Sequence, residues 1–384
     1  MFYVAGVRIA VVKETRPGEH RVALVPGLVE KLTALGYEVA VEPGAGVAAE
    51  CPDDAYRETG ATVDATAMEG AAVVVSVQPL EASRLSQLPA GTATVSFLPT
   101  TTSPELVEAA RDAQVTAFAM ELIPRISRAQ SMDALSSQAL VAGYRSIMIA
   151  GERLRRFLPL NMTAAGTVPP AEIVVLGAGV AGLQAIATAK RLGAVVRAYD
   201  VRAAAAEEIA SMGAKPIELD LDTLEGAGGY AREMTEERAA RQRELLTPYI
   251  ADADALITTA AVPGRTAPML VTREMVEQMK PGSVVVDLAA ESGGNVEGVV
   301  AGEEIMIGNA LVHGASNVPS QMPAPASRLY AQNIINLLTL MTVEGEFVPD
   351  FDDEVVAGCC VTHGGEIRHQ PTAEALAGKE GTPT

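Results

Sequence analysis

The 384-residue sequence contains no tryptophan, few aromatic residues and only three cysteines. Aromatic side chains make up 4% of the chain, so its core has to be built mainly from alanine, valine, leucine and isoleucine. Cys51, Cys359 and Cys360 are odd in number and lack the spacing of a metal site. The neighbours Cys359 and Cys360 allow a strained vicinal disulfide, but we favour buried reduced thiols, which suit a reducing cytoplasm.

Basic residues are scarce relative to acidic ones. The chain has 29 lysines and arginines against 48 aspartates and glutamates, a formal net charge of −19. Such a surface repels polyanions, which argues against nucleic acid and anionic membranes as general partners. No apolar run reaches the ~18 residues of a membrane-spanning helix, so we expect no direct span. Histidines are scattered and no P-loop or GxSxG pattern is present, so we expect no metal site and no serine nucleophile.

One stretch, residues 171–202, has the order strand, glycine turn, helix, strand and acid. This order is typical of a dinucleotide-binding βαβ unit. Gly177 permits the tight turn, Gly179 leaves the backbone open to a pyrophosphate, and Gly182 lets the helix pack closely on the sheet. The helix N-terminus adds unpaired N–H groups and a positive dipole end. A glycine-rich turn that binds nothing is the alternative, and the complete order argues against it.

The acid of this unit, Asp200, can accept hydrogen bonds from both ribose hydroxyls of NAD(H). Its charge would repel the 2′-phosphate of NADP(H). Arg202 complicates this interpretation, because an arginine nearby could tolerate that phosphate. We interpret Arg202 as the first turn of the next helix and favour NAD(H) as the cofactor.

The length and the recurring valine-rich runs predict an α/β fold with two Rossmann-like, doubly wound parallel-sheet domains separated by a cleft. We assign residues 1–134 and 320–384 to an N-terminal domain that lacks the glycine fingerprint. Residues 135–319 form the NAD(H)-binding domain, including a linking helix over 135–157. An apolar helix over 326–341 returns the chain to the first domain.

Three further segments are interpreted from composition. Residues 158–170 are expected to be a proline-containing linker, and residues 313–319 a turn. The tail from Val343 is acidic and glycine-rich, and we expect its last ten or so residues to be disordered. The segment 226–242 combines a glycine hinge with Tyr230, which suggests either a mobile flap or an ordinary surface loop.

A polar, irregular segment, residues 121–133, is the best candidate to meet a nicotinamide, since it follows the C-terminal end of a predicted parallel strand. Arg125 can donate to a carboxamide oxygen or a phosphate, and Gln130 can both donate and accept. Asp133 and Ser136 can hold an amide NH₂. The alternative role for Asp133 or Ser136 is to cap the long helix, and capping does not exclude contact with a ligand.

Sequence motifs along essentially the whole chain resemble the NAD(H)-binding component, domain I, of the proton-translocating nicotinamide nucleotide transhydrogenases. The similarity is to the separate α1 subunit found in some bacteria, and more distantly to alanine dehydrogenase. The matching stretches are KETRPGEHRVALVP, PRISRAQSMD, GYRS, VLGAGVAGLQAIATAKRLGA, GGYAREM, SNVPSQMPA and VTHGG.

This resemblance implies roles for individual residues. The loop with Arg125, Gln130, Asp133 and Ser136 would hold the nicotinamide of NAD(H), and Gln130 would also reach NADP(H) on a partner domain. Tyr230 would close over the nucleotide. The remaining cofactor-binding positions implied are Gly177, Gly179, Val180, Gly182, Asp200, Val201, Arg202, Gly229, Thr259 and Ala260.

The resemblance also implies a function within a complex. NADH would give its hydride directly to NADP⁺ bound by a separate β subunit (domain III), and a membrane-spanning subunit would couple this to proton translocation. This chain would bind NAD(H) and not NADP(H). It would be a homodimer, cytoplasmic and peripheral on the inner face of the plasma membrane through its partners.

Alanine dehydrogenase chemistry is the enzymatic alternative. The chain keeps one expected arginine as Arg21, but it has Ser76 in place of a lysine, Pro99 in place of a histidine and Glu291 in place of an aspartate. Oxidative deamination would then lack its proton-transfer groups. Hydride transfer between two nicotinamides requires only positioned C4 atoms and exclusion of water. The alternative that is not an enzyme is a regulatory NAD-sensing protein without catalysis.

Overall fold

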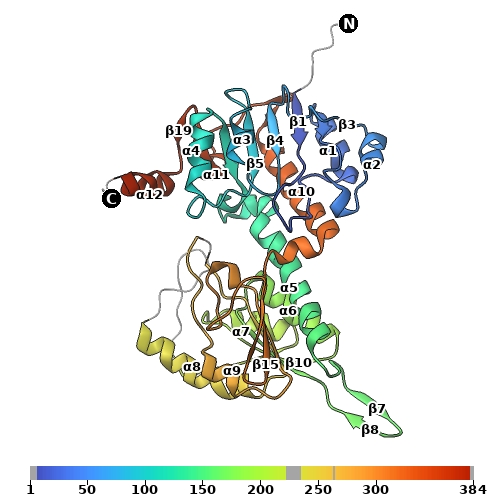
Figure 1. The fold of residues 1–384 in the computed structure, drawn as a ribbon, viewed down its shortest axis with the longest axis vertical. Coiled ribbons are helices and arrows are strands. Elements are labelled where there is room, and N and C mark those ends of the chain that lie inside the picture. Colours follow the sequence, from blue (N-terminus) through green and yellow to red (C-terminus); the bar gives the residue numbers. More distant parts are fainter. Residues whose placement is uncertain (1–6, 222–234, 263, 381–384) are drawn as a thin grey trace. The chain divides into compact units, whose positions relative to one another are not determined.

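The computed structural model describes residues 7–221, 235–262 and 264–380. They belong to two compact units, one of residues 1–138 with 320–384 and one of residues 139–319, which are described separately (Figure 1). Each unit contains a mainly parallel sheet with helices packed on both faces. The predicted α/β class with parallel-sheet domains is therefore confirmed.

The first unit has an eight-stranded sheet in the order β19-β18-β6-β5-β4-β1-β2-β3. The six strands from β3 to β6 in this order are parallel. Their continuous apolar runs are typical of strands covered on both faces. The bounds are β1 (Arg8–Val11), β2 (Glu38–Val41), β3 (Thr62–Val63), β4 (Val73–Val75), β5 (Ala93–Ser96) and β6 (Thr116–Ala119).

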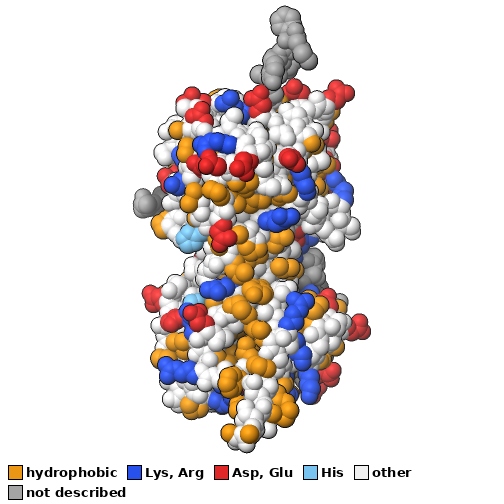
Figure 2. Space-filling view, turned by 90° about the vertical axis from the view of Figure 1, so that its right-hand side faces the viewer, with side chains coloured by type: hydrophobic (Ala, Val, Ile, Leu, Met, Phe, Trp, Pro, Cys, Tyr) orange, Lys and Arg blue, Asp and Glu red, His pale blue; other side chains and the backbone are white. Residues whose placement is uncertain are grey.

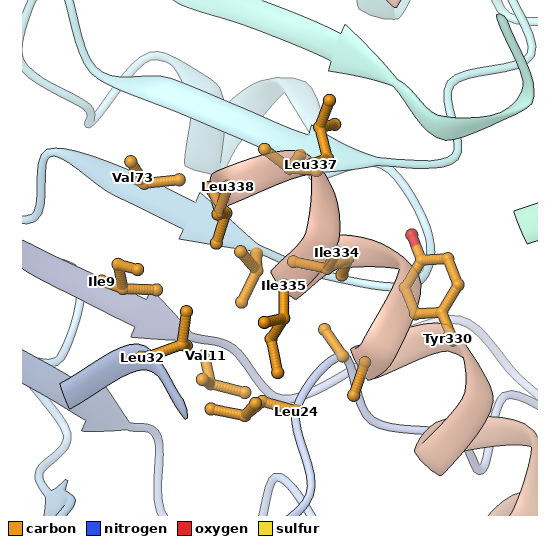
Figure 3. Packing of buried hydrophobic residues seen from close by; sticks show 14 of the residues in the cluster. Ile9, Val11, Leu24, Leu32, Val73, Tyr330, Ile334, Ile335, Leu337 and Leu338 are labelled. Carbon is orange, nitrogen blue, oxygen red and sulfur yellow. The ribbon is translucent and has the colours of Figure 1, made fainter. Parts of the chain in front are cut away.

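Alternate side chains of β1 enter two different cores. Ile9 and Val11 pack with α1 (Val29–Ala34) and α10 (Pro323–Leu340), as Figure 3 shows for one face. On the other face, Ala10 packs with α3 (Ala82–Leu85) and α4 (Pro104–Asp112). Each large aliphatic side chain buried in this way contributes about 1.5–3 kcal/mol. The first unit also contains α2 (Asp53–Glu58).

The tail is part of the first unit's sheet. After the hairpin β16 (Thr342–Val343) and β17 (Glu346–Phe347), it contains α11 (Glu354–Cys359), β18 (Cys360–His363), β19 (Glu366–Ile367) and α12 (Gln370–Glu380). β18 pairs antiparallel with β6 and so covers its hydrogen-bonding edge. We expected the last ten or so residues to be disordered. This expectation is wrong for the residues up to Glu380, which belong to α12, and the described chain ends there.

The adjacent cysteines lie at the junction of α11 and β18. Both are free and buried, in agreement with the reduced-thiol interpretation. Burial raises the pKa of Cys360 to about 11, so its thiol is protonated at neutral pH.

The second unit has a seven-stranded sheet in the order β11-β10-β9-β12-β13-β15-β14. Only β14 runs antiparallel to its neighbour among these strands. His313 and Gly314 belong to β15, so the interpretation of 313–319 as a turn is wrong at its start. The bounds are β9 (Glu172–Leu176), β10 (Val195–Tyr199), β11 (Lys215–Pro216), β12 (Ala255–Thr258), β13 (Val284–Asp287), β14 (Glu304–Ile307) and β15 (Ala310–Gly314).

The helices of the second unit also cover both sheet faces. α5 (Ala134–Arg153), α6 (Val180–Arg191) and α7 (Ala205–Ser211) lie on one face. α8 (Glu236–Ala251) and α9 (Arg273–Glu277) lie on the other. No helix in the described ranges is long and apolar enough to cross a bilayer.

Two predictions about the chain after α5 need correction. The helix ends at Arg153, before the predicted residue 157. The expected linker contains a two-stranded hairpin of β7 (Asn161–Thr163) and β8 (Gly166–Val168). Gly166, with φ +131°, closes its turn, a conformation that side chains rarely adopt.

Candidate functional site

The glycine turn lies between β9 and α6, in the middle of the second sheet. A Cβ on Gly182 would lie 1.9 Å from the carbonyl oxygen of Gly177, so the helix can approach the turn only without a side chain there. Gly177 itself has φ +98°, and its Cβ would lie 2.5 Å from Thr259 Oγ1. The strand order reverses between β9 and β12, which is where open α/β sheets bind nucleotides.

Gly179, unlike Gly177 and Gly182, has open space beside it. A Cβ at this position would meet no atom within 4 Å, so the space in front of α6 is open. Val180 begins the helix and is 42% exposed. The first N–H groups of a helix lack intrahelical partners and attract anions. The turn and the helix therefore fit the pyrophosphate of a dinucleotide.

Asp200 follows β10, as predicted, but its carboxylate is already engaged. Oδ2 accepts the backbone N–H of Ala178 at 2.7 Å. Oδ1 accepts the backbone N–H and the Nε–H of Arg202 at 2.9 and 3.0 Å, and Nη2 of the same arginine lies 3.3 Å from Oδ2. These four donors fill the acceptor positions of a carboxylate.

Arg202 therefore folds back over the glycine turn. Its Nη2 also donates to the carbonyl oxygen of Ala178 at 3.1 Å. α7 begins only at Ala205, so the interpretation of Arg202 as the first turn of that helix is wrong. The contact with Asp200 explains the difference, because it needs a bend directly after the strand.

A cavity of about 150 Å³ opens beside Asp200. Its apolar side chains include Ile209 and Ile217, and Val201 also lines it. Arg238 reaches it from α8, a residue that no sequence pattern singled out. An apolar pocket with a few polar groups is typical of the adenosine end of a dinucleotide site.

The segment after β12, with Thr259 and Ala260, is held in place by Asn295. The Asn295 amide accepts the Ala260 N–H at 3.0 Å and donates to its carbonyl oxygen at 2.8 Å. Thr259 Oγ1 donates to the Gly177 carbonyl oxygen at 3.1 Å. Asn295 was missed because only the folded chain brings it beside this strand end. Gly229 and Tyr230 lie outside the described residues.

In the first unit, the predicted nicotinamide loop runs from η3 (Met120–Leu122) through η4 (Ser127–Met132) to the start of α5. Asp133 Oδ1 accepts the backbone N–H of Ser136 at 2.9 Å, and Oδ2 accepts its hydroxyl at 2.6 Å. The capping interpretation is thus confirmed. Arg125 and Gln130 are exposed, and the Gln130 amide forms no hydrogen bond within the described chain.

Distant segments hold this loop in its conformation. Asn333 and Asn336 of α10 both donate to the Ser131 carbonyl oxygen, at 2.9 and 2.8 Å. Asp353, at the start of α11, binds both terminal nitrogens of Arg128, at 2.9 and 3.1 Å. The loop is therefore ordered by parts of the chain about 200 residues later.

Arg21 lies in a buried polar cluster at the carboxyl edge of the first sheet. Its Nε and Nη2 donate to the two carboxylate oxygens of Glu19 at 2.8 and 2.7 Å, and Nη1 donates to Gln138 at 2.9 Å. Burial alone would raise the pKa of Glu19, but the guanidinium outweighs it and lowers that pKa to about 2. Every guanidinium nitrogen thus has an acceptor within the protein.

Glu121, in η3 directly after β6, is expected to make the stability of the first unit depend on pH. Its carboxylate oxygens accept the Leu98 N–H at 2.9 and 3.0 Å, and burial raises its pKa from 4.5 to about 7. The folded state therefore binds its proton more tightly than the unfolded chain, so stability falls as pH rises through that window. We expect Glu121→Gln to increase the free energy of unfolding by about 3 kcal/mol near about pH 8 and to change it little near about pH 4. Urea titrations at both values check this, and an equal change at both would contradict it.

Comparisons with known proteins match both units. The family model described as alanine dehydrogenase/PNT, N-terminal domain, matches residues 10–142. The corresponding C-terminal domain model matches residues 146–370.

Individual relatives cover between 76 and 95% of the chain. The first part of NAD(P) transhydrogenase subunit alpha of Rhodospirillum rubrum is 48% identical over 376 residues, which cover 94% of this chain and 98% of that protein. The alanine dehydrogenase of Bacillus subtilis is 31% identical over 296 residues, covering 76% and 72%. A crystal structure of transhydrogenase from Sinorhizobium meliloti is 44% identical, with a TM-score of 0.84, covering 95% of this chain and 99% of that one.

Proposed function

This chain belongs to the alanine dehydrogenase/PNT family, and on that basis we propose that it is the NAD(H)-binding subunit of a proton-translocating transhydrogenase. Homology to transhydrogenase alpha subunits supports its role in such a complex. In this proposal, hydride passes directly from NADH to NADP⁺ on a partner β subunit. Other subunits couple the transfer to proton movement and hold this chain at the inner face of the plasma membrane.

The observation that carries the proposal is the chemistry available at the carboxyl edge of the first sheet. Ser76 stands where alanine dehydrogenase has its lysine, and its hydroxyl donates to the Gln78 carbonyl oxygen at 2.6 Å. Arg21 is occupied by Glu19 and Gln138. A substrate carboxylate would have to compete with these buried partners, and the lysine and histidine that would move a proton are replaced by Ser76 and Pro99.

Each group of residues has a separate task in this proposal. Bound NADH supplies the hydride. Gly179 and the start of α6 hold the pyrophosphate, and Arg125 with the Asp133–Ser136 pair orients the carboxamide. Gln130 orients the nicotinamide against the partner's NADP⁺, and Tyr230 closes over the nucleotide and excludes water.

The direct test is hydride transfer from NADH to an NADP⁺ analogue, with and without the purified NADP-binding partner. We expect this chain alone to bind NADH with little turnover, and transfer to begin when the partner is added. Pyruvate and ammonia serve as the second substrate set. Turnover of that set by this chain alone would favour an alanine-dehydrogenase-like enzyme and overturn the proposal.

We also propose that the subunit is a homodimer, joined through a surface of the second unit. The hairpin β7–β8 and its approach expose Phe157, Leu160 and Met162 at 58, 52 and 75%. Figure 2 looks towards the side where this hairpin projects and shows hydrophobic side chains gathered there. A two-stranded hairpin is only marginally stable in water, and an exposed apolar patch is typical of an interface.

Met162→Asp is expected to weaken the dimer at least about tenfold, because it would bury an unpaired carboxylate in the interface. Sedimentation equilibrium measures the effect. Met306→Asp is the matched control, since Met306 is 60% exposed on β14 of the same unit. A wild-type monomer, or equal effects of both substitutions, would argue against this surface.

A further inference from the structure

A buried chain of hydrogen bonds in the first unit begins at the pair of Glu19 and Arg21, to which the proposed function assigns no task. Two nitrogens of the Arg21 guanidinium donate to the Glu19 carboxylate, which fixes the plane of the guanidinium. Its third nitrogen, Nη1, donates to Gln138 Oε1 at 2.9 Å. Gln138 is also buried, and its Nε2 donates to Ser137 Oγ at 3.2 Å.

From Ser137 the hydrogen bonds continue to the loop that carries Gln130. The Ser137 hydroxyl donates to Asn333 Oδ1 at 2.7 Å, and Asn333 Nδ2 donates to the Ser131 carbonyl oxygen at 2.9 Å. Asn333 is a buried residue of α10. Each group on this path donates to the next one, so the chain runs without a break from Arg21 to Ser131.

The last acceptor of the chain is one residue away from Gln130. Peptide groups are planar, so the φ and ψ of Ser131 are the only soft dihedrals between its carbonyl group and the Gln130 Cα. The Gln130 amide is exposed and makes no hydrogen bond within the described residues, so its direction depends on the backbone that carries it. A fixed Ser131 carbonyl group therefore restricts where Gln130 points.

We propose that Asn333 is a positioning residue for Gln130, and that the buried pair of Glu19 and Arg21 is the fixed end of the hydrogen-bond chain through which it acts. The inference rests on the proposed function, in which Gln130 orients the nicotinamide against the NADP⁺ of the partner. Arg21 then serves the geometry of hydride transfer and does not bind a substrate.

Asn333→Ala breaks the chain without adding bulk to the packed helix. Both groups that lose the amide keep another partner. The Ser137 hydroxyl can donate to the Ala134 carbonyl oxygen, 3.1 Å away, and Asn336 still donates to Ser131 at 2.8 Å. We therefore expect the variant to fold. Single-turnover transfer from NADH to NADP⁺ in the reconstituted complex should fall about tenfold, with the NADH Kd changed less than about threefold.

Combining Asn333→Ala with Gln130→Asn distinguishes positioning from general damage. If Asn333 acts through Gln130, the double variant should be slower than Gln130→Asn alone by less than about twofold, whereas independent effects would multiply. Multiplied losses, or a wild-type transfer rate in Asn333→Ala, would overturn the inference.

Arg21→Lys tests the far end of the chain. Lysine keeps a positive charge beside Glu19, but its single nitrogen cannot hold both that carboxylate and Gln138 in the geometry of the guanidinium. We expect transfer to slow about threefold, again with little added loss in the Gln130→Asn background. A wild-type transfer rate in this variant would contradict the part assigned to Arg21.

Hydrogen–deuterium exchange of this chain alone provides a measurement that does not depend on transfer. Asn333→Ala should speed exchange in residues 127–133 about tenfold, because the loop loses one of its anchors. Thr339→Val is the control, since it removes a hydrogen bond within the same helix, from Thr339 Oγ1 to the Ile335 carbonyl oxygen. It should change neither the loop exchange nor the transfer rate.

The two measurements separate the inference from the proposed function. Unchanged exchange of the loop in Asn333→Ala would overturn the inference even if the wild-type complex transfers hydride. Absence of transfer by the wild-type complex would instead overturn the proposed function, on which the task of Gln130 rests.

Discussion

Replacing Gly182 with alanine is expected to abolish measurable NADH binding and to lower the free energy of unfolding by about 2–3 kcal/mol. The new Cβ would lie 1.9 Å from the Gly177 carbonyl oxygen and 3.1 Å from Thr259 Oγ1. The first of these atoms is backbone in a turn with positive φ, so it cannot rotate away. α6 must move outwards, which displaces the N–H groups proposed to hold the pyrophosphate.

Gly179→Ala is expected to remove NADH binding without destabilising the fold. Its Cβ would enter open space, and its φ of −72° suits alanine, so we expect the unfolding free energy to change by less than about 1 kcal/mol. We expect NADH binding to be lost nevertheless, because the methyl group fills the space assigned to the pyrophosphate. Calorimetric titration and urea unfolding of both variants check the pair. Normal NADH binding by Gly179→Ala would show that the pyrophosphate lies elsewhere.

The second large effect is expected from Gln130→Asn. The shorter side chain withdraws the amide by about one carbon–carbon bond, and a misplacement near 1 Å can slow a reaction between positioned groups about 100-fold. Because the wild-type amide makes no hydrogen bond within the described chain, stability should not change. We therefore expect transfer from NADH to NADP⁺ in the reconstituted complex to fall about 100-fold, with the NADH Kd changed less than about threefold.

Single-turnover stopped-flow kinetics measures this rate, and fluorescence titration measures the Kd. Gln87→Asn is the matched control, an equally small change at an exposed position of the same unit. A rate unchanged by Gln130→Asn would remove this residue from the reaction. A rate loss that follows weaker NADH binding would assign it to binding alone, as expected of a non-catalytic NAD sensor.

The strand, glycine turn and helix of the proposed dinucleotide-binding unit could be predicted from sequence because each of their signals is local. One short stretch contains the glycines at 177, 179 and 182, the helix that ends before Gly193, and the acid at 200. The same holds for the Asp133 cap of α5, where donor and acceptor are three residues apart. Patterns of this kind depend on backbone geometry and helix periodicity, which the chain encodes without distant partners.

Hydrogen-bond partners far apart in sequence were not predictable in this way. Packing of whole elements brings Arg128 to Asp353. It also brings the Asn295 amide within hydrogen-bonding distance of the Ala260 backbone. Composition also gave no sign of the strand in the tail, because β18 forms by pairing with the edge of β6, a strand about 240 residues earlier.

The sequence by itself thus determined the fold class, the family and the glycine turn between β9 and α6. Only the tertiary structure decided how the site residues are held and which of their polar atoms are already engaged. Asp200 is the clearest case: its position after β10 follows from the local pattern, while the occupation of its oxygens by Arg202 and Ala178 follows from the bend after the strand. Burial and hydrogen-bond saturation are properties of the packed chain, and the order of residues alone does not contain them.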